Sequence, residues 1–214
     1  MNIALIGATG FVGTPLLSEL LSRGHKVTVL ARNPGKLAPQ PGLTVVAADA
    51  LDEAQIAKAV AGQDAVVSAY NPGWSEPKIH NIFLQASAAI VQGVKQAGVK
   101  RLLVVGGAGS LFVAPGLQLV DTPQFPAQYK QGALAAREAL NLLKLENTLD
   151  WSFVSPPIGL APGERTGNYR LGADDLLPGT GDQPAGISVA DLAVAIVDEV
   201  ETPRHVQRRF TVAH

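Results

Sequence analysis

The sequence lacks cysteine, a dominant charge and any long apolar run, and each absence excludes a class of protein. Without cysteine among its 214 residues, the chain has no disulfides, thiolate metal ligands or thiol catalysis. Its formal net charge of -1 gives no basic field for nucleic acid or an anionic membrane. No apolar run reaches the roughly 18 residues of a membrane span. We expect a cytoplasmic protein, monomeric or homodimeric, whose partner is a small-molecule substrate and neither nucleic acid nor membrane.

Short runs rich in Val, Ile and Leu alternate with segments of helical period along most of the chain. The runs are apolar throughout, as expected for a parallel sheet with helices on both faces. We therefore predict a single domain over residues 1–214 with a doubly wound, Rossmann-type α/β fold. The predicted strands cover residues 2–7, 25–32, 43–49, 64–70, 100–107, 149–156 and 207–213. The predicted helices cover residues 14–24, 52–62, 80–98, 127–146 and 188–201.

A segment rich in Gly and Pro over residues 156–187 interrupts this alternation. It is longer than most connections in compact domains, and long loops of this kind often carry binding residues. We predict that it forms a small substrate-side region in the C-terminal part of the chain. The four histidines show no metal-ligand spacing, so we expect no metal site.

Residues 7–13 form a G-x-x-G-x-x-G motif between the first predicted strand and the first predicted helix. In that setting the glycines permit a tight turn, close approach of backbone to a pyrophosphate, and close packing of helix on strand. The helix N-terminus also directs free N–H groups at the phosphates. A plain tight turn needs glycine as well, but the strand-to-helix setting favours a dinucleotide site. The expected contacts are Gly7, Ala8, Thr9, Gly10, Phe11, Val12 and Gly13.

Arg32 and Asn33 stand at the end of the second predicted strand, where an acidic residue would hydrogen-bond the ribose of NAD. A guanidinium pairs instead with a 2′-phosphate, so we predict NADPH in preference to NADH. Lys36 is an alternative for this role, in which case Arg32 is an ordinary solvated side chain.

Asp49, Ala50 and Leu51 follow the third predicted strand. The Asp49 carboxylate would accept a hydrogen bond from the adenine amino group, with the backbone of Ala50 and Leu51 beside it. The alternative is that Asp49 caps the helix that follows.

The motifs GATGFVG, DAVVSAY, RLLVVGGAGS, SPP and ISVADLAVAIVDEVE occur in this order along the chain. Together they resemble the atypical short-chain dehydrogenases/reductases, in the subgroup of NAD(P)H-binding proteins similar to NmrA, to biliverdin reductase B and to NADH-flavin reductases. The resemblance spans essentially the whole chain and implies a Rossmann fold that binds a pyridine nucleotide. It adds to the expected nucleotide contacts Ala69, Tyr70, Gly106, Gly107, Ser155, Pro156 and Pro157.

Dehydrogenases of the wider family carry a Ser at the end of the fifth strand and a Tyr-x-x-x-Lys sequence on the next helix. The resemblance places Tyr129 at the Tyr position, but Ala133 stands at the Lys position and Gly107 at the Ser position. Ser110 and Tyr129 are the catalytic candidates, although a turn serine and a surface tyrosine are also common without function. Lys130 is the candidate cofactor contact nearest the missing lysine, although it points about 100° away from Tyr129.

These residues predict an NADPH-dependent reductase that transfers hydride to a flavin, a quinone or a similar conjugated acceptor. Such an acceptor takes its proton from solvent and does not require the Tyr-Lys pair. Two alternatives stay open. One is a non-enzymatic NADP(H) sensor resembling NmrA; the other, less favoured, is a sugar-nucleotide epimerase or dehydratase, whose proton handling at a hydroxyl carbon would need the missing lysine.

Aromatic residues make up only 5% of the chain, yet several fall in loops that follow the predicted strands. These loops lie at the carboxyl ends of the strands, where open α/β sheets bind ligands. Their side chains would form a flat apolar surface for a substrate, or else cap the core beneath long loops. The aromatic residues are Tyr70, Trp74, Phe112 and Phe125, and Asn71 lies in the same loop as Tyr70 and Trp74.

Overall fold

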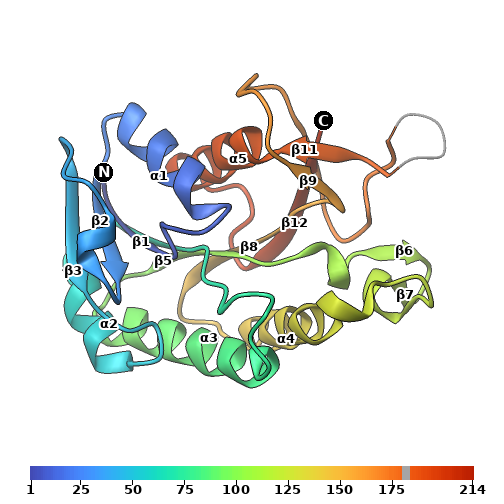
Figure 1. Ribbon diagram of the computed structural model, residues 1–214, viewed down its shortest axis with the longest axis horizontal. Helices are drawn as coiled ribbons and strands as arrows, with labels where there is room; N and C mark the ends of the chain where they lie inside the picture. Colours follow the sequence, from blue (N-terminus) through green and yellow to red (C-terminus); the bar gives the residue numbers. More distant parts are fainter. Residues whose placement is uncertain (180–183) are drawn as a thin grey trace.

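The computed structural model describes residues 1–179 and 184–214, and its centre is a twisted sheet (Figure 1). The strand order is β10-β12-β8-β5-β4-β1-β2-β3, and all neighbours pair in parallel except β10 and β12. This order extends the 3-2-1-4-5-6 order of a dinucleotide-binding sheet by two strands. The doubly wound parallel fold predicted from the sequence is therefore confirmed. The strands are β1 (Asn2–Ile6), β2 (Lys26–Ala31), β3 (Leu43–Ala47), β4 (Ala65–Ser68), β5 (Arg101–Val105), β8 (Asp150–Ser155), β10 (Arg170–Gly172) and β12 (Arg208–Ala213).

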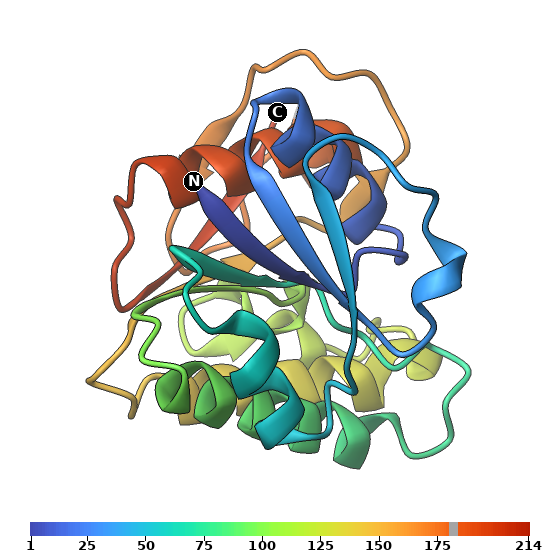
Figure 2. The ribbon, with the colours of Figure 1, turned by 90° about the vertical axis from the view of Figure 1, so that its left-hand side faces the viewer.

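Helices cover the two faces of the sheet unequally (Figure 2). Helices α1 and α5 lie on one face, and α2, α3 and α4 lie on the other. Each face has its own apolar core, with Phe210 buried beneath α1 and α5 and with Trp151 and Phe153 buried on the opposite side. The helices are α1 (Gly13–Ser22), α2 (Glu53–Val60), α3 (Ile79–Gln96), α4 (Ala127–Leu143) and α5 (Val189–Glu201).

Side-chain caps fix where α2 and α5 begin. The Asp52 carboxylate accepts a hydrogen bond from the Gln55 amide at 3.0 Å, and the Ser188 hydroxyl accepts one from the Asp191 amide at 2.9 Å. Such caps satisfy N–H groups that have no partner inside the helix. The alternative in which Asp49 caps the helix after β3 is therefore wrong, because Asp52 caps that helix.

The predicted substrate-side region, residues 156–187, contains more regular structure than its composition indicates. Strand β9 (Gly159–Ala161) pairs in parallel with β11 (Gly186–Ser188), and β10 adds an antiparallel edge to the main sheet. Ahead of it, β6 (Phe112–Ala114) pairs with β7 (Leu117–Gln118) as a short hairpin. Strands of two or three residues are too short to display a period, so no sequence pattern predicts them. Residues 180–183 of this predicted region lie outside the described residues.

Within residues 1–179 and 184–214, no helix combines the length and the apolar character that crossing a membrane requires. The same residues contain no group of three or more His, Cys, Asp or Glu side chains placed to hold a metal ion.

Candidate functional site

The first and third glycines of the 7–13 motif are required by close backbone contacts. Gly7 has a positive φ of 85°, and a Cβ atom there would lie 2.5 Å from the Ala69 carbonyl oxygen at the end of β4. A Cβ atom on Gly13 would lie 1.9 Å from the Gly7 carbonyl oxygen. Both distances are far below van der Waals contact, so neither position accepts a side chain without a backbone shift. The loop is therefore drawn tightly against β4 and the start of α1.

The N-terminus of α1 is open to an anion. No side chain caps it, and no acidic residue occupies its first turn. The Gly10 amide donates to the Gly7 carbonyl at 3.1 Å and the Thr14 amide to the Gly10 carbonyl at 3.0 Å, which closes the turn. Thr9, Gly10 and Phe11 are exposed beside it. An uncapped helix end with its N–H groups and dipole directed at solvent suits a diphosphate, so the cradle fits a dinucleotide.

The ends of β2, β3 and β4 converge where the adenosine half was predicted. Tyr70, just beyond β4, is half-buried, and burial raises the pKa of its hydroxyl. Arg32 after β2 and Asp49 after β3 are close enough to act on the same pKa, Arg32 lowering it and Asp49 raising it. The three side chains therefore share one neighbourhood. Arg32 and Asn33 are exposed there, so the guanidinium is available to a phosphate.

Asp49 is part of a turn of its own. Its carboxylate accepts a hydrogen bond from the Leu51 amide at 3.0 Å, and its backbone amide donates to the Gln55 side chain at 3.0 Å. Ala50 is buried and Leu51 is 41% exposed. The turn presents the Asp49 region at the edge of the sheet and leaves Leu51 as an apolar surface beside it.

Further along the carboxyl edge of the sheet, the other predicted nucleotide contacts lie at the ends of β5 and β8. A Cβ atom on Gly106 would overlap the Phe153 ring at 2.1 Å, whereas Gly107 has open space around it. Ser155 is completely buried, and within the described residues its hydroxyl has no hydrogen-bond partner. Pro156 and Pro157 are buried beside it. The chain therefore leaves the end of β8 along a fixed path.

Ser110 is packed rather than open. It is 3% exposed, and its hydroxyl accepts a hydrogen bond from Arg209 Nη1 at 3.1 Å. The same Nη1 atom also donates to the Ser110 carbonyl at 3.1 Å, and Arg209 Nε donates to the Asp174 carboxylate at 2.7 Å. Arg209 on β12 thus joins the segment after β5 to the segment after β10. No sequence pattern indicates Arg209, because it lies 99 positions after Ser110 in the chain.

Tyr129 lies at the start of α4 and is 39% exposed. Its ring meets Trp74, from the β4–α3 loop, edge to face with 5.0 Å between ring centroids. Lys130 is exposed. One turn on, Ala133 is buried, and its Cβ atom would lie 2.8 Å from a Cβ placed on Gly109. A buried alanine therefore stands where the Tyr-x-x-x-Lys apparatus requires a lysine, so that apparatus is absent.

The other predicted aromatic positions differ in exposure. Trp74 is 54% exposed, whereas Phe112 and Phe125 are half-buried. Asn71 accepts a hydrogen bond from the Gly73 amide at 2.8 Å and so shapes the loop that presents Trp74. The apolar surface available at this edge is therefore centred on the Trp74–Tyr129 pair.

A second feature absent from the sequence analysis is the outer segment, residues 164–170, which lies over α1 and α5 (Figure 2). Arg165 donates two hydrogen bonds to the buried Glu19 carboxylate of α1, at 2.7 and 2.8 Å. Tyr169 donates one to Asp198 of α5. The segment is therefore anchored to both helices.

Asp191 at the start of α5 provides a further anchor. It is completely buried and accepts hydrogen bonds from the Thr166 amide at 2.8 Å, the Gly167 amide at 2.7 Å and the Thr166 hydroxyl at 2.7 Å. His214 Nε2 lies 2.9 Å from the same carboxylate. Burial opposes ionisation, but these hydrogen bonds outweigh it and hold the pKa of Asp191 at about 2. The carboxylate therefore ties the outer segment to the C-terminal residue.

The glycine turn, the uncapped helix and the converging ends of β2, β3 and β4 define a Rossmann-type dinucleotide-binding protein. Over residues 7–203 the chain matches the model of the NAD(P)H-binding family. It therefore belongs to the NAD(P)H-binding family, which indicates a nicotinamide cofactor, and its resemblance to the atypical short-chain dehydrogenases/reductases is confirmed.

Solved structures of three similar proteins share this fold along the whole chain. A Burkholderia pseudomallei protein, provisionally named as exported, is 47% identical with a TM-score of 0.90, and each chain is covered completely. A provisionally named epimerase from Bacteroides thetaiotaomicron is 44% identical with a TM-score of 0.92, covering 100% of this chain and 96% of the other. A provisionally named NADH-flavin reductase from Streptococcus pneumoniae is 32% identical with a TM-score of 0.85, covering 100% and 99%. The chain therefore has an NAD(P)H-binding, oxidoreductase-like fold.

Proposed function

We propose that this protein is an NADPH-dependent reductase that transfers hydride to a flavin, a quinone or a similar conjugated acceptor. The observation that carries the proposal is a contrast between two regions at the carboxyl ends of the strands: the nucleotide cradle and the region around Ala133. The nucleotide cradle has its tight glycines and open helix end, whereas Ala133 packs against Gly109 where a dehydrogenase places its lysine. A nucleotide site without a proton-transfer pair suits an acceptor that is protonated by water.

Each part of the edge has a role in this proposal. The amides at the start of α1 bind the diphosphate, and Arg32 pairs with the 2′-phosphate. Ser155, Pro156 and Pro157 would border the nicotinamide ring, which would supply the hydride. The acceptor would take its proton from water, so these residues would need only to orient the two rings.

The acceptor itself would rest on the Trp74–Tyr129 pair. Two exposed aromatic rings held edge to face provide a rigid apolar surface for a flat conjugated molecule. Tyr129 orients the acceptor in this proposal and need not donate a proton. Ser110 contributes through its packing, because its hydroxyl is already held by Arg209. The provisional name of the Streptococcus pneumoniae protein is in keeping with a flavin as the acceptor.

The test is a steady-state assay of NADPH oxidation with FMN and, separately, with a simple benzoquinone. We expect oxidation above the uncatalysed rate, with kcat of the Tyr129→Phe variant within about threefold of wild type. A Tyr129 that acted as general acid would instead cost roughly 10²–10⁴-fold in kcat. Trp74→Ala should raise KM for the acceptor while leaving KM for NADPH unchanged.

The assay also separates the alternatives. Tight NADP(H) binding without oxidation of any acceptor would overturn the reductase and favour a nucleotide sensor. Turnover of a nucleotide sugar without net NADPH consumption would favour an epimerase, the provisional name of the Bacteroides thetaiotaomicron protein. We disfavour that activity because proton handling at a hydroxyl carbon needs the lysine that Ala133 replaces.

A further inference from the structure

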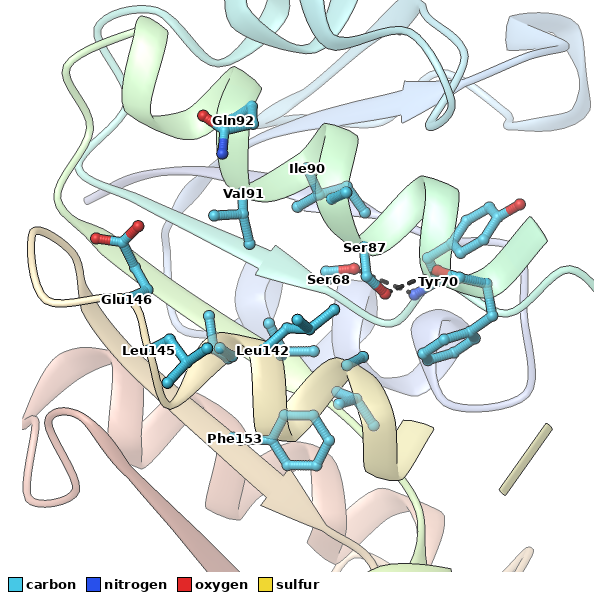
Figure 3. Close-up of a pocket in the computed structure, with 16 residues that line it drawn as sticks. Ser68, Tyr70, Ser87, Ile90, Val91, Gln92, Leu142, Leu145, Glu146 and Phe153 are labelled. Carbon is cyan, nitrogen blue, oxygen red and sulfur yellow. Dashed lines mark hydrogen bonds between the residues drawn. The ribbon is translucent and has the colours of Figure 1, made fainter. Parts of the chain in front are cut away.

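A cavity of about 270 Å³ opens between α3 and α4, on the face of the sheet opposite α1 (Figure 3). Its floor is formed by the core residues Phe153, Val105 and Ile90, and its mouth by Leu142 and Leu145. We propose that this cavity is a binding site for a neutral, mainly apolar molecule of one or two rings that carries a single hydrogen-bond acceptor. Its lining includes Tyr70, a predicted nucleotide contact, but none of the residues of the glycine turn, and the proposal does not depend on the proposed reductase activity.

The cavity is held open by contacts at both of its ends. Ala135, Ala136 and Ala139 of α4 pack with Phe83 of α3 in a small apolar cluster. Beyond the other end, Lys95 of α3 forms a salt bridge with Glu146 just after α4, with 2.7 Å between Nζ and Oε2. The two helices are thus fixed above and below the opening, and the space exists before any ligand arrives. Pre-formed cavities with largely apolar walls are the usual form of small-molecule sites.

The size and chemistry of the walls select the ligand. An apolar cavity of roughly 150 Å³ holds benzene, so about 270 Å³ accommodates up to two fused rings. The Ser87 hydroxyl donates to the Phe83 carbonyl at 2.8 Å and is already used. The Ser68 hydroxyl accepts from the Tyr70 amide at 3.4 Å, and among the described residues its proton has no acceptor. It can therefore donate to one acceptor atom on the ligand.

The charged groups at the cavity are already paired. Hydrogen bonds from the Lys95 ammonium and then from Thr148 hold the pKa of Glu146 at about 2, so its carboxylate is ionised at neutral pH. Glu146 lines the cavity, and its oxygens accept hydrogen bonds from Lys95 and Thr148. A charged ligand of either sign would find no free counter-ion here, and burying an unpaired ion against largely apolar walls is costly. The ligand is therefore neutral.

The mouth is too small for a protein partner. Leu142 and Leu145, exposed by 55% and 78%, are the only two large apolar side chains at the cavity among those exposed in the described ranges. The neighbouring positions Gln92 and Gln96 of α3 are polar and exposed. A stable protein interface needs about 800 Å² from each partner, with an apolar centre. Two leucines above a deep hollow fit a small molecule instead.

The experiment uses 2-naphthol as the probe, titrated into the full chain by isothermal calorimetry without nucleotide. We expect one site per chain. Ala88→Trp places an indole over the opening from the exposed face of α3 and should raise Kd at least tenfold. Ala54→Trp, at an exposed position on α2 away from the cavity, is the matched control and should leave Kd unchanged.

Two further variants distinguish a loss of binding from misfolding and test the polar contact with the ligand. Leu142→Arg changes an exposed residue at the mouth and should weaken 2-naphthol with no change in the circular dichroism spectrum. Ser68→Ala should weaken 2-naphthol about fivefold but leave naphthalene unaffected, because only the former has an oxygen for the hydroxyl. Equal Kd values for Ala88→Trp and Ala54→Trp, or no heat up to the solubility limit, would overturn the proposal. A dimer that Ala88→Trp dissociates in sedimentation velocity, with no naphthol binding, would assign the mouth to a second copy of the chain.

Discussion

Gly13 is the residue on which the geometry of the nucleotide cradle depends most directly. It is the first residue of α1, yet a Cβ atom there would overlap the Gly7 carbonyl across the turn. A hydrogen in place of a side chain is what allows the helix end to lie against the loop. The glycines of the motif thus allow a ligand to approach the backbone closely, and they also allow the positive φ of the turn.

Gly13→Ala should weaken NADP⁺ binding at least tenfold and destabilise the fold by about 1–3 kcal/mol, because the new methyl group forces the turn away from the helix. Gly35→Ala is the matched control, since a Cβ there meets nothing within 4 Å. Isothermal calorimetry and urea denaturation measure the two effects. Wild-type affinity in Gly13→Ala would show that the turn is not the phosphate site.

Arg32 is the residue that should decide between the two nicotinamide cofactors. It is exposed at the end of β2, close enough to Tyr70 to influence the hydroxyl. Arg32→Ala should raise Kd for NADPH at least tenfold and leave Kd for NADH nearly unchanged, since only NADPH carries the 2′-phosphate. Lys36→Ala, measured in parallel by fluorescence titration, tests the neighbouring cation. A loss confined to Lys36→Ala would transfer the role to that residue.

At the scale of elements, the outer segment depends on one buried carboxylate. The folded-state pKa of Asp191 is about 2, below its ordinary value of 3.8. Its hydrogen bonds therefore stabilise the fold fully above pH 4, and the contribution is lost as pH falls toward 2. The shift corresponds to about 2 kcal/mol.

Asp191→Asn should lower the free energy of unfolding at pH 7 and flatten its decline between pH 5 and pH 2, because the amide does not titrate. Urea denaturation at a series of pH values measures both effects. Asp175→Asn, at an exposed position outside these contacts, should retain the wild-type profile. An unchanged acid limb in Asp191→Asn would show that other carboxylates govern it.

The elements divide into those that local sequence determines and those that it does not. The parallel strands are continuous apolar runs, and the helices that follow have clear period, so both were predicted from the sequence. The strands β9, β10 and β11 form only because distant partners provide their hydrogen bonds. In the candidate site, too, only the features that depend on local sequence could be predicted. The glycine motif is local and was predicted, whereas the contacts of Arg209 and Asp191 depend on side chains brought together by the complete fold.

At the scale of the molecule, nucleotide binding should stabilise the whole fold, because the cradle joins the first strand, the first helix and the end of β4. At 100 times Kd, NADP⁺ should add about 2.7 kcal/mol and raise Tm by roughly 5–10 °C. Differential scanning fluorimetry with NADP⁺ and NAD⁺ at equal concentrations measures this and ranks the two. No rise with either nucleotide at millimolar concentration would remove the basis of the proposed function.

The anchoring of the outer segment has a consequence for proteolysis. Arg165 is exposed, and so are its neighbours on both sides, which is the usual description of a cleavage site for trypsin. Yet a protease must pull several residues of the chain into its own groove, and here Glu19, Asp191 and Asp198 hold them on two helices. Cleavage at Arg165 must therefore wait for these anchors to open, and its rate reports how often α1 and α5 release the segment that joins them.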